Sequence, residues 1–174
     1  MILRPLNIDR DKEPLHLLYS DPSCCEFLLN PATEHLHETV ALLRKYDTED
    51  ADHSWVIAET DEAPALGQVK MIPRGYDTFE AAIMLTPQAQ GKGLAVKALT
   101  DALDIAFDRH LARRVFADID PDNSPSLRLF EKVGFQFEGR LRATYETHLG
   151  VRDSVVVSLL ESDPKPWRGE PQTL

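Results

Sequence analysis

Two glycines separated by one residue stand where an apolar, strand-like run gives way to a helical pattern. The stretch 85–95 reads Leu-Thr-Pro-Gln-Ala-Gln-Gly-Lys-Gly-Leu-Ala, with the glycines at Gly91 and Gly93. Glycine lets the backbone come close to a ligand, and a helix that begins there points unpaired N–H groups and its positive dipole end outward. The stretch therefore predicts a turn that binds an anion.

The spacing within this turn excludes the two common phosphate-binding loops. A Walker loop requires Ser or Thr after Gly-Lys, whereas Gly93, Leu94 and Ala95 follow Lys92. The dinucleotide-binding fingerprint requires a third glycine where this chain has Val96. The pattern that remains is Gln-x-x-Gly-x-Gly, which begins at Gln88.

The elements beside the turn form a strand, helix and strand. Residues 80–85 predict a strand and residues 93–110 a helix, because small and large apolar residues recur along one side of the helix. Residues 114–120 alternate between apolar and polar side chains, as in a strand with one buried face. The two strands should therefore be parallel neighbours.

The rest of the chain predicts further strands around this unit. A helical turn or two should begin at Asp21-Pro22, and Thr33 is expected to cap the next helix. Runs 55–59 and 67–72 should pair as a hairpin. The other expected strands are 2–6, 135–141 and 151–160. The fold class is therefore mixed α/β.

The length and composition of the chain limit its possible domain organisation. A chain of 174 residues with 43% apolar residues suits one domain, expected over 1–162, followed by an irregular tail at 163–174. It has no long apolar run and no secretion signal, which by default predicts a cytoplasmic protein. Adjacent Cys24 and Cys25 do not suit a disulfide, and the histidines do not suggest a metal site.

The net charge of −10 predicts cationic partners such as amines. It argues against binding to nucleic acid or to anionic membranes. A homodimer is compatible with the sequence.

A second motif follows the second parallel strand. Residues 123–135 read Asn-x-x-Ser-x-x-x-Phe-Glu-Lys-x-Gly-Phe, with Pro125 suited to the first turn of a short helix and Gly134 to its end. Together with Gln-x-x-Gly-x-Gly, this motif resembles the GNAT superfamily of acyl-CoA-dependent N-acyltransferases over about residues 54–160. Gly150-Val151-Arg152-Asp153 further resembles the branch that contains ribosomal-protein N-terminal acetyltransferases and their small-molecule relatives.

The resemblance implies one domain with a mostly antiparallel sheet, helices on both faces, and a central parallel strand pair that splays apart to admit the pantetheine arm of acetyl-CoA. It implies no metal. Leu85 would offer backbone groups to the arm, Asn123 would bind the arm or a water, and the loop would bind the pyrophosphate. The implied cofactor-binding residues are Leu85, Gln88, Gln90, Gly91, Lys92, Gly93, Leu94, Ala95, Asn123, Ser126 and Phe130.

The implied reaction transfers acetyl from acetyl-CoA to a primary amine, on a small molecule or a protein N-terminus. Many relatives protonate the leaving sulfur with a tyrosine where this chain has Phe130. Ser126 is therefore the candidate acid, and Asn123 is a further candidate catalytic residue. Glu80 is the first candidate base, with Asp118 and Asp120 as alternatives. The missing tyrosine leaves a second hypothesis, a catalytically weakened acyl-CoA-binding sensor or partner module.

Overall fold

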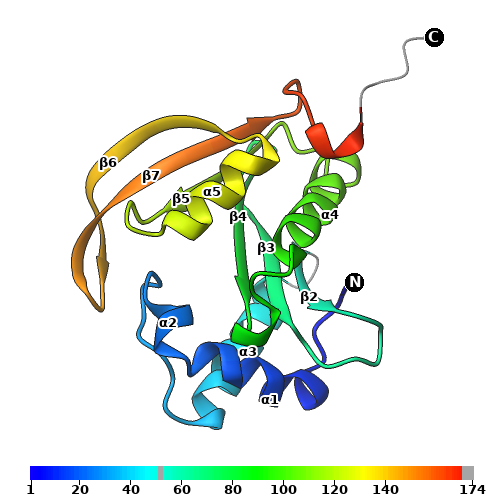
Figure 1. Cartoon of the computed structure of the whole chain (residues 1–174), viewed down its shortest axis with the longest axis vertical. Coiled ribbons are helices and arrows are strands. Elements are labelled where there is room, and N and C mark those ends of the chain that lie inside the picture. The colour runs from blue at the N-terminus through cyan, green and yellow to red at the C-terminus, as the bar shows by residue number, and fades with distance from the viewer. Residues whose placement is uncertain (51–52, 170–174) are drawn as a thin grey trace.

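A sheet of seven strands, in the order β1-β2-β3-β4-β5-β7-β6, runs through the protein, whose computed structural model describes residues 1–50 and 53–169 (Figure 1). Every neighbouring pair is antiparallel except β4 and β5, which are parallel. The predicted mixed sheet with a central parallel pair is therefore confirmed. The strands are β1 (Ile2–Arg4), β2 (Ser54–Ala58), β3 (Gly67–Pro73), β4 (Thr78–Leu85), β5 (Arg114–Ile119), β6 (Gln136–Thr147) and β7 (Gly150–Leu160).

Helices cover both faces of the sheet, as expected. Successive side chains of β2 point to opposite faces of the sheet, and each face has its own hydrophobic cluster. Ile57 packs in the cluster that contains residues of α4 and α5, whereas Val56 packs in the cluster that contains residues of α1 and α3. The helices are α1 (Ile8–Tyr19), α2 (Pro22–Cys25), α3 (Leu36–Asp50), α4 (Leu94–Asp108) and α5 (Ser124–Val133), with short 3-10 turns η2 (Pro87–Ala89) and η3 (Pro166–Arg168). No helix in the described part of the chain is both long and apolar enough to cross a membrane.

Helix α1 had no counterpart among the predicted elements. Pro14 interrupts its pattern, although Asn7 caps the helix by accepting a hydrogen bond from the Arg10 N–H at 3.1 Å. A buried ion pair then fixes it to β1, because Arg4 donates to both carboxylate oxygens of Asp11 at 2.7 Å each. Tertiary contacts therefore stabilise this helix, although the local sequence pattern does not predict it.

The two predicted caps in the first third of the chain have different outcomes. Asp21 caps α2 as expected. Its carboxylate accepts hydrogen bonds, of which the one from the Ser23 hydroxyl has the largest effect, and these bonds hold its pKa below the ordinary value. Thr33 does not cap α3, because Glu38 reaches back and accepts the backbone N–H groups of Glu34 and His35 at 2.8 and 2.9 Å. The carboxylate satisfies the donors that a threonine cap would have taken.

The last two strands form a long curved hairpin whose tip bends toward α2 (Figure 1), where the His148 N–H donates to the Leu29 carbonyl at 3.1 Å. Strand β6 runs to Thr147, beyond the predicted end at residue 141, and two irregularities interrupt its register with β7. After β7 the chain returns to α4, where the Trp167 indole N–H donates to Asp104 at 3.0 Å and Arg168 pairs with the same carboxylate. Part of the predicted tail thus packs on the domain.

Candidate active site

The parallel strands β4 and β5 separate partway along their length. Their pairing covers Thr78–Glu80 against Arg114–Phe116 and then ends, although β4 continues to Leu85 and β5 to Ile119. Beyond Glu80 and Phe116 the facing edges of the two strands no longer pair with each other, which suits an extended ligand that pairs as an added strand would. The splayed pair that the family resemblance implied is therefore present, and the other site residues lie around it.

The glycine loop connects β4 to α4. Gly91 and Gly93 have φ angles of 73° and 76°, in the left-handed region that favours glycine, and a Cβ atom on either would meet no heavy atom within 4 Å. Backbone conformation rather than crowding therefore requires glycine here. Gly93 is the N-cap of α4, so the N–H groups of Leu94 and Ala95 lie in the first turn, where no intrahelical acceptor exists. The loop can hold an anion at the positive end of the helix.

The carbonyl oxygen of Leu85, at the end of β4, receives two side chains. Gln90 Nε2 donates to it at 3.2 Å, and the Cys24 thiol of α2 lies 3.7 Å away. Gln90 also lies 3.5 Å from the Cys24 sulfur. Burial, followed by the charge of Asp21, raises the pKa of the Cys24 thiol, which therefore favours the protonated form. The structure thus brings Leu85 and Gln90 together, and it adds a residue of α2 that the sequence did not indicate.

The remaining loop residues differ in their surroundings. Lys92 is exposed between the glycines, where its charge can reach an anion held by the loop. Gln88 is exposed in η2 and lines a groove whose other wall includes Glu13 and Leu17 of α1. Its predicted contact with the pyrophosphate stays a prediction.

Asn123, Ser126 and Phe130 lie on the first two turns of α5. Asn123 is the N-cap, and its Oδ1 accepts the Ser126 N–H at 3.1 Å. Ser126 is half-buried, whereas Phe130 is only 2% exposed and packs edge-on against Phe135, with ring centroids 4.9 Å apart. Phe130 therefore belongs to the core as well as to the predicted site.

Glu80, the first candidate base, forms an ion pair. It lies at the last β4 position that pairs with β5, and its Oε2 accepts a hydrogen bond from Arg74 Nε at 2.7 Å. The guanidinium neutralises the charge of this carboxylate.

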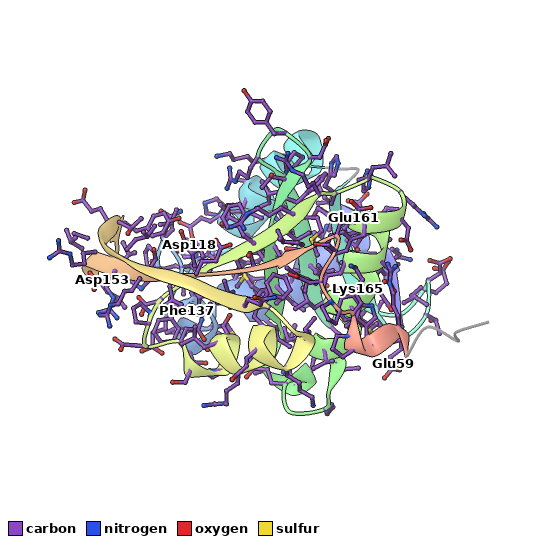
Figure 2. All side chains as sticks on the ribbon, turned by 90° about the horizontal axis from the view of Figure 1, so that it is seen from above. Glu59, Asp118, Phe137, Asp153, Glu161 and Lys165 are labelled. Atoms are coloured by element: carbon purple, nitrogen blue, oxygen red, sulfur yellow. The ribbon has the colours of Figure 1, made fainter. Side chains whose placement is uncertain are left out.

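Asp118, the second candidate, lies beyond the last β4–β5 pair and on the same face of the sheet as Glu80. Its Oδ2 accepts the Tyr145 hydroxyl at 2.7 Å, and Figure 2 labels it beside the curved β6–β7 hairpin. Its Oδ1 is buried and has no hydrogen-bond partner among the residues that the structure describes. Within the same residues Asp118 forms no ion pair.

Asp120, the third candidate, is held by Arg152 of β7. Nε and one terminal nitrogen of Arg152 donate to its two oxygens at 2.8 and 2.9 Å, and Asp122 shares the same guanidinium. These bonds lower the pKa of Asp120 below the ordinary value. Asp120 and Arg152 therefore join the ends of β5 and β7 beside the Asn123 turn, which suits a structural role.

Tyr145, like Cys24, is a residue at this site that sequence reasoning missed. It comes from β6, and it reaches β5 only because the hairpin curves and its register is irregular between Leu141 and Tyr145. A prediction from alternating side chains requires regular strand pairing. The sequence pattern could therefore not show that this hydroxyl contacts β5.

Comparison with known proteins agrees with this architecture. The sequence pattern of the acetyltransferase (GNAT) domain matches residues 1–136. Spermidine N(1)-acetyltransferase of Escherichia coli (strain K12) is 27% identical over 139 residues, which cover 80% of this chain and 74% of the relative. An uncharacterised N-acetyltransferase, p20 of Bacillus licheniformis, is 27% identical over 94% of both chains.

A solved structure has the same fold. Spermidine N-acetyltransferase from Vibrio cholerae, in complex with CoA and spermine, superposes with a TM-score of 0.78 at 24% identity, covering 92% of this chain and 95% of the other. These relatives are named as enzymes, so the alternative of a sensor without catalysis gains no support, and they do not single out the ribosomal-protein branch.

The splayed strands, the left-handed glycines and the open first turn of α4 suit an extended ligand that carries phosphate groups, as acetyl-CoA does. The family match spans most of the chain and includes the glycine loop and the α5 motif. The chain belongs to the acetyltransferase (GNAT) domain family.

Proposed function

We propose that the protein transfers acetyl from acetyl-CoA to a small molecule that carries a primary amine and at least one further positive charge, as polyamines do. The observation that carries this proposal is Asp118, a carboxylate with one unpartnered oxygen and no ion pair among the described residues, just beyond the last β4–β5 pair. A net charge of −10 favours approach of such a cation. The spermidine acetyltransferases among the relatives support the same class of acceptor.

In the proposed reaction, the amine nitrogen forms a bond to the acetyl carbon as the carbon–sulfur bond breaks. The amine must lose a proton, and we assign its acceptance to Asp118, directly or through a water, with Glu80 as the second candidate. Backbone N–H groups near Leu85 would stabilise the oxyanion. The leaving thiolate takes up a proton from a water, or from Ser126 as solvent returns a proton to the serine oxygen.

The cosubstrate contacts in this proposal follow the loop and the start of α5. N–H groups of residues 90–95 would bind the pyrophosphate, with Lys92 adding charge and Gln88 beside them. The Leu85 carbonyl, which Gln90 contacts at 3.2 Å, would pair with the arm once Gln90 turns toward the phosphates. Asn123, Ser126 and the ring of Phe130 would line the other side. The domain that performs this reaction is proposed to span 1–162.

A peptide N-terminus is the rival acceptor, because Gly150–Asp153 resembles the ribosomal-protein branch. A thiol-release assay with acetyl-CoA separates the two. Spermidine should be acetylated with a kcat/KM at least about tenfold above that of a monoamine of similar length, because the net charge of −10 attracts a cation with further positive charges more strongly. Faster transfer to a neutral-side-chain peptide than to spermidine would overturn the proposed acceptor class.

A further inference from the structure

We propose that Tyr145 is a positioning residue for acetyl transfer: it holds Asp118 so that one carboxylate oxygen is occupied and the other is left to the acceptor amine. The contact on which this rests is the hydrogen bond from the Tyr145 hydroxyl to Asp118 Oδ2 at 2.7 Å. The inference rests on the proposed function, because Tyr145 positions the carboxylate that accepts the proton in that reaction.

A bulge in β6 aims Tyr145 at β5. The register with β7 breaks between Leu141 and Tyr145, and Ala143 within the break has a φ of 51°. Asp153 of β7 stabilises this irregular backbone, because its Oδ1 accepts the Ala143 N–H at 2.9 Å while its Oδ2 accepts Arg140 Nε, also at 2.9 Å. Figure 2 labels Asp153 near the turn end of the β6–β7 hairpin. Bulges characteristically redirect side chains in this way.

Tyr145 is suited to donating a hydrogen bond rather than a proton. Burial, then the hydrogen bond and charge of Asp118, raise its pKa above the ordinary value, and the charge of Glu80 acts in the same direction. An acid is most effective when its pKa lies near the working pH, so this phenol is a poor proton donor to a thiolate. It remains neutral and keeps its hydrogen on Asp118.

The bond to Tyr145 decides which oxygen of Asp118 can serve the amine. Oδ2 is occupied, whereas Oδ1 is buried without a partner among the described residues. A buried acceptor that lacks a partner is destabilising, and a charged donor compensates that cost best. An ammonium or amine N–H would complete the carboxylate once the side chains that cover Oδ1 move aside to admit the acceptor. Glu80 and Asp120, by contrast, already have Arg74 and Arg152 as partners.

The experiment is a double-mutant cycle on kcat with spermidine as acceptor, using Tyr145→Phe, Asp118→Asn and the double variant. Tyr145→Phe should lower kcat about 10- to 100-fold, the rate equivalent of losing a hydrogen bond to a charged group. The dissociation constant of acetyl-CoA should stay unchanged. In the Asp118→Asn background, removing the hydroxyl should change kcat little, because the two residues act as one unit. Tyr76→Phe is the matched control, since Tyr76 is 90% exposed on the β3–β4 turn.

Equal fold-losses in both backgrounds, or a normal kcat in Tyr145→Phe, would overturn the inference while leaving the proposed function intact. A wild-type protein that acetylates no amine would overturn both. Asp153→Ser gives a second route if Tyr145→Phe proves too unstable to assay, because it loosens the bulge without touching Asp118. It should lower kcat in the otherwise unchanged protein but change it little in the Asp118→Asn background, and equal losses in the two would again overturn the inference.

Discussion

Arg74 and Glu80 form an ion pair across the β3–β4 turn, with Arg74 Nε 2.7 Å from Glu80 Oε2. Asp118, on the neighbouring strand, has the neutral Tyr145 hydroxyl in place of a cation. The two carboxylates flank the same strand separation, but only one of them is charge-compensated. This difference decides which is expected to serve the acceptor amine.

The first prediction compares these carboxylates directly. Asp118→Asn should lower kcat about 10²- to 10⁴-fold, the range for loss of a general base. Glu80→Gln should lower it less than about tenfold and cost at most about 1 kcal/mol of stability, as for other partly exposed ion pairs. Steady-state kinetics with spermidine checks both, and the reverse ranking of the two variants would return Glu80 to the role of base.

The second prediction concerns the glycine loop. Gly91→Val should raise the dissociation constant of acetyl-CoA by at least about tenfold, because a β-branched residue resists a positive φ and the loop must change shape. Gly75→Val is the matched control: Gly75 has a φ of 81°, and a Cβ there also meets nothing within 4 Å. Both variants should lose similar stability, so a calorimetric titration isolates binding. Equal affinity in the two folded variants would contradict the loop assignment.

The third prediction concerns the leaving thiolate. Ser126→Ala should lower kcat about 10- to 1000-fold with acetyl-CoA affinity largely unchanged, since a proton donor acts only in the transition state. Its backbone N–H still donates to Asn123, so the helix cap remains. Ser124→Ala, at an exposed position in the same first turn of α5, controls for helix effects. A normal kcat, or a loss confined to affinity, would make Ser126 a cofactor contact only.

The fourth prediction is a pH dependence of stability. Hydrogen bonds from Arg114 and Ser158 lower the pKa of Glu138 to about 2. A lowered folded pKa stabilises the protein above the unfolded pKa of about 4.3, and that contribution is lost as pH falls toward about 2. Glu138→Gln should therefore lower Tm at pH 6 and have a progressively smaller effect at pH 4 and below. A constant difference in Tm across this range would contradict the shift.

Much of this site follows from the sequence, because local rules govern it. Gly91, Gly93 and the Asn123 cap depend on backbone conformation, and the strand–helix–strand unit between them depends on periodicity. Their positions around the strand separation were therefore predictable.

The contacts that pair the carboxylates were not predictable in the same way. Arg74 and Glu80 meet across a hairpin turn, whereas Tyr145 and Asp118 come from strands separated by β7 and meet through a bulge. Sequence ranked Glu80 first because it precedes the loop, but it contained no signal that Arg74 would neutralise it. Long-range geometry decided the difference.

The most direct test of the account is acetyl transfer itself. Purified protein is mixed with acetyl-CoA and spermidine, thiol release is followed, and the amine is analysed by mass spectrometry for one added acetyl group. The account predicts stoichiometric thiol release and monoacetylated spermidine, with much slower transfer by Asp118→Asn. Binding of acetyl-CoA without acetylation of spermidine or of any other amine would contradict it.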